Sequence, residues 1–254
     1  MKTKNLVTIL VMTFLLINLS SCNKDTNTLP GTIQLNASAT SAAVKSAAIQ
    51  TTAGTVALQT AAVEIQNVTI EENTGNDNEN NNADGGKDSE GKDNEKNSGK
   101  DNEKKSQEND GGDVVLAGPY VLYIVNGKAT IDQVSVQPGN YKKVDFDFVA
   151  GPENSGNSIL ITGEYTSSAG VTVPFKLTSD LSATVQLPLT KNISVNSGST
   201  VSVSIVFDVQ NWLSGLNFES ATVTGNKILI NAQQNTSLYN SFITAVNQHI
   251  QVED

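Results

Sequence analysis

Apolar and polar residues alternate along most of the second half of the chain, and this period of two constrains the fold more than any other feature. The clearest run is "STVSVSIVFDV", in which Val201, Val203, Ile205 and Phe207 share one parity. Successive side chains of a strand point to opposite faces, so the run predicts a strand with one buried face. Four further runs repeat the pattern: Val144/Phe146/Phe148, Ile159/Ile161/Tyr165, Val171/Val173/Phe175/Leu177 and Ala183/Val185/Leu187/Leu189. Short strands separated by turn residues are typical of an antiparallel β-sandwich.

The first half of the chain adds strands with less regular patterns. Ile33, Leu35 and Ala37 alternate in "TIQLNAS". In "AAVEIQNVTIEE" the apolar parity switches at residues 66–67, which predicts a β-bulge there. In "VVLAGPYVLYIVNG", residues 121, 123 and 125 are expected to share a face, and Asn126-Gly127 predicts a tight turn.

Two features predict an edge of the sheet and a helix that follows the strands. Pro174 lies inside a strand pattern and suggests an edge strand, because proline cannot donate to a ladder. Near the chain end, one apolar stripe has helical spacing, and Asn235 or Thr236 could cap that helix. The stripe is formed by Leu238, Phe242, Ala245, Val246, His249 and Ile250. Its polar face carries Asn, Ser, Thr and Gln in place of the lysines of a membrane-surface helix, so we expect it to pack on the sandwich.

A highly polar tract, residues 71–113, interrupts the strands. It holds fourteen acidic residues and six lysines, a net charge of −8 (6 − 14), out of −10 for the chain. Such a segment buries too little apolar surface to offset chain entropy, so we expect a disordered insertion. The alternative is a linker between two domains. Part of the tract resembles a calcium-binding EF-hand loop, but Gly91 stands where that loop needs a glutamate, so we predict no metal site.

The start of the chain predicts export and lipidation. Lys2 and Lys4 precede an apolar run at 6–17, too short to span a bilayer but suited to a signal peptide. Cys22, the only cysteine, follows Leu19-Ser20-Ser21 in an arrangement that resembles a bacterial lipobox. We therefore expect a signal peptide over 1–21, a lipidated tether over 22–30, and a sandwich over 31–250 interrupted by 71–113. Acyl chains on Cys22 would anchor the protein to a membrane.

Little in the sequence points to catalysis. His249 is the only histidine, so Ser-His-Asp and Cys-His arrangements are almost excluded. Asp145 and Asp147 lie two apart on one strand face and are the best candidates for a carboxylate-type hydrolase, although such alternation is ordinary on an exposed face. We predict no enzyme activity and no cofactor. All sixteen basic residues are lysine in an acidic chain, which argues against a nucleic-acid partner.

Trp212, the only tryptophan, leaves two alternatives open. An exposed indole would suit a glycan-binding module, whereas a buried one would close the end of the sandwich, and we favour the buried alternative. Several segments resemble a group of uncharacterised outer-membrane lipoproteins of the Bacteroidetes type: "GPYVLYIVNGKA", "PGNYKKVDFDF", "GNSILITGEYT", "VPFKLTSD" and "VSIVFDVQNWLSGL".

This resemblance implies a lipid-anchored β-sandwich without an assigned activity. We expect a non-catalytic envelope lipoprotein with a binding or structural role. Lys24-Asp25 after the cysteine favours display on the cell surface over a periplasm-facing anchor. Glycan binding, a fimbrial or assembly role, and hydrolysis are the alternatives.

Overall fold

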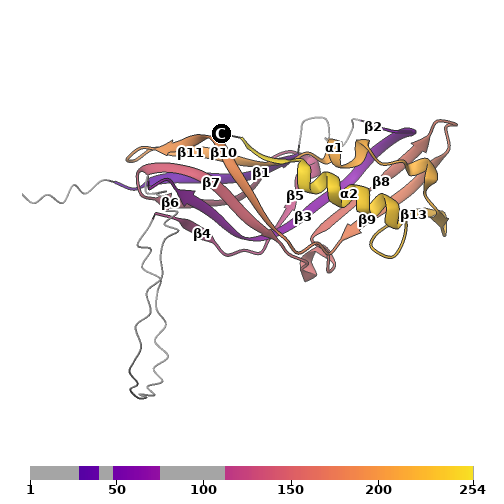
Figure 1. Cartoon of the computed structure of the whole chain (residues 1–254), viewed down its shortest axis with the longest axis horizontal. Coiled ribbons are helices and arrows are strands. Elements are labelled where there is room, and N and C mark those ends of the chain that lie inside the picture. Colours follow the sequence, from indigo (N-terminus) through magenta and orange to yellow (C-terminus); the bar gives the residue numbers. More distant parts are fainter. Residues whose placement is uncertain (1–28, 40–47, 75–111, 254) are drawn as a thin grey trace, which may run out of the picture.

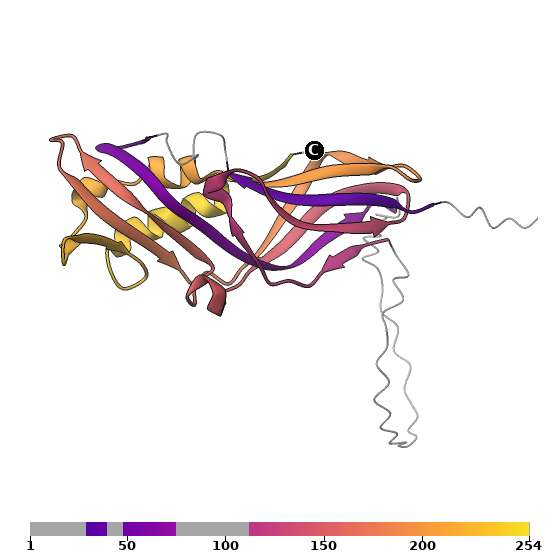
Figure 2. The same cartoon turned by 180° about the vertical axis from the view of Figure 1, so that it is seen from behind.

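A computed structural model describes residues 29–39, 48–74 and 112–253 of the chain. They form an elongated, mainly β body with two short stretches of α-helix on one part of it (Figures 1 and 2). The strands before the insertion are β1 (Gly31–Ala39), β2 (Ile49–Thr51) and β3 (Gly54–Glu72). Those after it are β4 (Val114–Leu116), β5 (Tyr120–Tyr123), β6 (Ala129–Val136), β7 (Gly139–Phe148), β8 (Ile159–Ser167), β9 (Thr172–Ser179), β10 (Thr184–Val195), β11 (Thr200–Phe207), β12 (Val223–Thr224), β13 (Lys227–Ile230) and β14 (Ile250–Glu253).

Within the described residues, the helical elements are α1 (Val209–Ser214), α2 (Thr236–Gln248) and three single 3-10 turns. Those turns are η2 (Ile124–Asn126), η3 (Pro152–Asn154) and η4 (Phe218–Ser220).

The strands form two sheets, and this confirms the mainly β fold class. The small sheet has the order β14-β11-β1-β6, and the remaining strands form a large sheet around β3. Most pairings are antiparallel, but β1 pairs with β11, and β9 with β13, in parallel. An alternating pattern shows only which face of a strand is buried, so it could not distinguish parallel from antiparallel pairing.

β3 is the strand on which the large sheet is built. Its 19 residues correspond to a contour of roughly 60 Å at the usual rise per residue. β8 pairs with residues 54–63 of β3, and β7 with residues 65–72. On the other edge, β5 and β4 pair with residues 62–65 and 68–70. β3 thus joins both halves of the elongated body (Figure 1).

The core lies between the large sheet and two different covers. In one half the cover is the small sheet, where the ring of Phe146 on β7 meets that of Phe207 on β11 at 5.9 Å. In the other half the cover consists of α1 and α2 (Figure 1). Trp212 on α1 lies where the two covers meet, with ring contacts to Phe207 at 5.9 Å and to Phe242 of α2 at 6.0 Å. One continuous hydrophobic core results.

The predicted bulge in β3 is confirmed. The register between β3 and β7 shifts between Gln66 and Thr69, and Asn67 has a φ of 50°. The prediction for residues 121–125 is wrong. Leu122 is buried while Tyr123 is 54% exposed, and Val125 lies beyond the strand, in η2.

The prediction that the strand containing Pro174 lies at an edge of the sheet is also wrong, because this strand, β9, pairs with β8 on one side and with β13 on the other. β13 pairs with β9 from Phe175 to Leu177, immediately after the proline. Proline is tolerated because the β13 ladder begins one residue later.

The predicted C-terminal helix is confirmed as α2, with Leu238, Phe242 and Val246 buried against the core. Asn235 does not cap it through its side chain. Its amide bonds instead to Thr222 and to the carbonyl of Leu229, and so ties the helix start to β13. The stripe was predicted to extend through Ile250, but that residue begins β14.

The acidic tract lies mostly outside the described residues, at 75–111. Its predicted start at residue 71 is two residues early, because β3 continues through Glu72. On its far side, Val114 pairs with Ile70. The two ends of the tract are therefore neighbours in one sheet.

Candidate functional site

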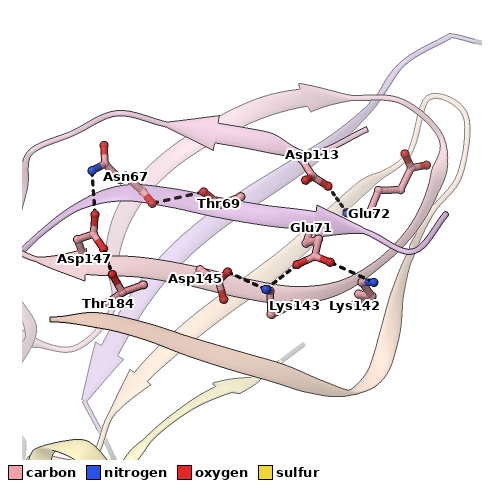
Figure 3. Close-up of polar contacts among 10 residues, drawn as sticks. All are labelled: Asn67, Thr69, Glu71, Glu72, Asp113, Lys142, Lys143, Asp145, Asp147 and Thr184. Carbon is pink, nitrogen blue, oxygen red and sulfur yellow. Dashed lines mark hydrogen bonds and ion pairs between the residues drawn. The ribbon is translucent and has the colours of Figure 1, made fainter. Parts of the chain in front are cut away.

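The outer face of the large sheet carries a polar surface built on β3, β7 and β10 (Figure 3). Val144, Phe146 and Phe148 of β7 point into the core. Strand alternation therefore turns Lys143, Asp145 and Asp147 outward. Asp145 and Asp147 are the two carboxylates that the sequence analysis placed on one face of this strand.

One end of this surface is an ion-pair network. Lys143 Nζ lies 2.6 Å from Glu71 Oε2 and 3.0 Å from Asp145 Oδ2, and Lys142 Nζ lies 3.0 Å from Glu71 Oε1. Hydrogen bonds from Lys143 and then Lys142 lower the pKa of Glu71, and the bond to Glu71 raises the pKa of Lys143. Partly exposed pairs of this kind contribute little to stability, from about 0 to 1 kcal/mol each.

Asp147 forms the other end, apart from the ion pairs. Its carboxylate accepts hydrogen bonds from Thr184 Oγ1 at 2.6 Å and Asn67 Nδ2 at 2.8 Å. These two bonds, the one from Thr184 first, lower the pKa of Asp147. Asn67 reaches Asp147 from the bulge, where its positive φ turns the backbone. The bulge therefore has a local consequence, because it brings an amide donor to the carboxylate.

A cleft of about 290 Å³ opens beside Asp147. Its side-chain polar groups come from Gln66, Asp147, Ser182 and Thr184. Gln66 pairs with Asp147, and Asp147 with Thr184, across three neighbouring strands. The cleft thus presents amide, hydroxyl and carboxylate groups on a rigid sheet, a donor and acceptor set suited to a polar, hydroxyl-bearing ligand.

The geometry counts against Asp145 and Asp147 as a hydrolytic pair. Asp145 is ion-paired with Lys143, and Asp147 is held by two neutral donors. Glycoside hydrolysis needs one carboxyl with a raised pKa as the general acid. The pKa of Asp147 is displaced in the opposite direction.

The glycan-binding role considered for Trp212 is wrong, because the indole is 0% exposed. Its Nε1–H donates to the backbone carbonyl of His249 at 3.1 Å. The indole therefore has no free face for a sugar ring, and it closes the core, as the favoured alternative predicted. His249 contributes its backbone here and is the C-cap residue of α2.

A second pocket, of about 270 Å³, lies at the end of the body formed by the β8–β9 turn. Its lining is mainly apolar, and two of its valines, Val171 and Val223, are 59% and 49% exposed. Tyr165 lies at its edge, where the hydroxyl contacts Glu219 Oε2 at 2.7 Å and the carbonyl of Ala53. Burial, and then Glu219, raise the pKa of Tyr165 to about 12.

Sequence reasoning missed Gln66 and Thr184, because their proximity to Asp147 depends on the register of three strands. It also missed Glu64, which is 0% exposed in β3. A single acid within the apolar run "AAVEI" was the signal that could have indicated it. Cys22 and the predicted signal peptide lie outside the described residues.

Within the described residues, no helix is long and apolar enough to cross a membrane, and no group of three or more His, Cys, Asp or Glu side chains is placed to hold a metal. Comparison of the chain with protein-family models, curated proteins and solved structures finds no match.

Proposed function

We propose that this chain is a non-catalytic lipoprotein of the bacterial cell envelope, anchored through acyl chains on Cys22 and serving in binding or as a structural component. The observation that carries the proposal is Leu19-Ser20-Ser21-Cys22 directly behind a signal-like apolar run. The arrangement of the body supports it. β1 begins at one extremity of the elongated body, and the β8–β9 turn lies at the other (Figure 1). Residues of that turn line part of the apolar pocket.

That arrangement suits presentation away from a membrane. With only residues 23–30 between the anchored cysteine and β1, the extremity that holds Gly31 would stay near the bilayer. The β8–β9 turn, with the apolar pocket beside it, would be directed outward. Display on the outer surface of the outer membrane is the orientation that we favour.

Metabolic labelling with a palmitate analogue tests the anchor. We expect label on the wild-type protein and none on Cys22→Ala, with Ser21→Ala as the control that keeps the thiol and remains labelled. Equal labelling of Cys22→Ala would refute the anchor. Protease added to intact cells then tests orientation, because only a surface-displayed protein is cut before the outer membrane is opened.

The cleft beside Asp147 favours a second candidate, recognition of a glycan by polar groups in place of the buried indole. Hydrogen-bonding side chains from three strands line it. A glycan array would compare the wild type with Gln66→Ala and Thr184→Val. Thr172→Val is the control, since Thr172 bonds to Thr166 on another part of the sheet, at 3.0 Å. Binding that the two cleft variants retain unchanged would exclude the cleft.

A further inference from the structure

The chain makes an excursion of ten residues, 149–158, opposite a single residue of β3. β7 ends at Phe148 opposite Ile65, and β8 begins at Ile159 opposite Val63, so one residue would suffice to join them as a continuous strand. Glu64 is the residue in between. Its backbone accepts a bond from Val149 N at 3.2 Å and donates one to Ser158 O at 2.8 Å. Both ends of loop 149–158 are therefore fastened to Glu64.

The loop folds over the outer face of the sheet and seals the Glu64 side chain. Both carboxylate oxygens are inaccessible to solvent, and neither has a hydrogen-bond partner. An unpaired buried carboxylate costs several kcal/mol, far more than a protein ordinarily tolerates without compensation. Loop geometry alone would not indicate a ligand, but this buried and unsatisfied acid does.

The loop contributes a second unsatisfied group. Asn154 is 2% exposed, and its Nδ2 also lacks a partner. A rotation of the amide by 180° would present Oδ1 in its place. Five polar or charged side chains are buried in the described residues, and three of them are Glu64 itself and two residues of loop 149–158, Asn154 and Ser158. A fourth residue, Ser179, is bonded to the loop, because Ser158 Oγ donates to the backbone carbonyl of Ser179 at 3.0 Å. Buried polarity is thus concentrated at one place in the fold.

We propose that Glu64 and loop 149–158 form a binding site for Ca²⁺. The Glu64 carboxylate supplies two hard oxygen ligands, and the Asn154 amide oxygen and backbone carbonyls of the loop would supply the others once an ion is bound. Calcium accepts six to eight such ligands with flexible geometry and readily uses backbone carbonyls. Magnesium usually keeps several waters, which a sealed site does not provide.

Gly151 lets the loop backbone approach the Glu64 carboxylate closely, because it has no side chain. A Cβ on this residue would lie 1.7 Å from Glu64 Oε1, so the loop backbone crosses directly over the carboxylate. Since the carboxylate has no accessible surface in this arrangement, an ion would enter only when the loop opens. We therefore expect slow association and release.

Thermal unfolding of the detergent-solubilised full chain tests the site. With free Ca²⁺ at 100 times its Kd, we expect Tm to rise by about 5–10 °C relative to EDTA. Glu64→Gln should abolish the rise. Glu153→Gln is the matched control, since it removes the same charge from an exposed position of the same loop and should leave the rise intact.

Three results would overturn the proposal: no difference between Ca²⁺ and EDTA, an equal rise in wild type and Glu64→Gln, or an equal rise with Mg²⁺. The second result would place the calcium-binding group away from Glu64, in another part of the folded chain. If Glu64→Gln does not fold, Asn154→Asp and Asn154→Ala provide the test. Calorimetric titration should then show tighter binding for the aspartate variant and weaker binding for alanine, and unchanged affinity in both would overturn the site.

Discussion

Replacement of Gly151 by alanine tests how closely loop 149–158 is packed on Glu64. Gly151 has φ −126° and ψ 160°, an extended conformation that alanine adopts without strain. The only obstacle is steric, because the new Cβ would lie 1.7 Å from Oε1, 2.4 Å from Cδ and 2.8 Å from Oε2 of Glu64. All three distances are far below van der Waals contact.

The cost follows from the burial of Glu64. Overpacking of a filled interior typically costs 1–3 kcal/mol. The carboxylate is sealed and cannot swing into solvent, so we expect a value near the upper end, about 3 kcal/mol. In a body of this size that corresponds to a fall in Tm of about 6–12 °C.

A double-mutant cycle isolates the contact. In a Glu64→Ala background the obstructing atoms are gone, so Gly151→Ala should cost less than about 0.5 kcal/mol, giving a coupling of about 2–3 kcal/mol. Urea unfolding in EDTA measures all four proteins without any contribution from a bound ion. Gly215→Ala is the control, since a Cβ there meets nothing within 4 Å. An equal cost of Gly151→Ala in both backgrounds would refute the packing described for the loop.

Three further predictions concern the core, the insertion and one tyrosine. Trp212→Ala should destabilise by about 3–5 kcal/mol, because it empties the junction of the two covers, and the native indole emission should lie to the blue of the unfolded state; an emission unchanged on unfolding would contradict its burial. Removal of 75–111 with a short turn in its place should leave Tm unchanged, since Glu72 N already bonds to Asp113 Oδ1 at 2.9 Å, and a large fall would show that the tract supports the fold. The pKa of Tyr165, about 12, lies above the unfolded value near 10, so this group stabilises the fold below pH 10 and that contribution is lost as pH rises from 10 through 12. Tyr165→Phe should flatten this loss and remove the late step of the tyrosine absorbance titration, and a titration unchanged by the substitution would assign the step to another tyrosine.

The sequence predicts strands well where one face is buried and the other is wet. Val203, Ile205 and Phe207 are buried as their alternation requires. The pattern fails in β3, where five successive residues, 61–65, are all buried. There the small sheet and helices cover one face while loop 149–158 covers the other, and a periodicity of two cannot express burial on both sides.

The residues of the candidate site could likewise be predicted only in part. Asp145 and Asp147 could be found from the sequence because they alternate with apolar neighbours on one strand. The different environments of these two carboxylates could not be predicted from the sequence. They depend on the pairing of β7 with β3 and β10 and on the bulge that turns Asn67 towards Asp147. Glu64 gives no periodic signal, since its burial depends on a loop contributed by a distant part of the chain.

The parallel pairing of β1 with β11 has a mechanical consequence for an anchored molecule. Eight residue pairs, from Thr32↔Thr200 to Ala39↔Phe207, link β1 to β11, and β6 holds its other edge. A pulling force that enters at residue 30 runs along the axis of β1, so the ladder bonds are loaded together in shear and do not open one after another. Rupture then requires many bonds to fail at once, which slows forced unfolding. With the anchoring proposed for Cys22, drag on the molecule would load β1 in this way.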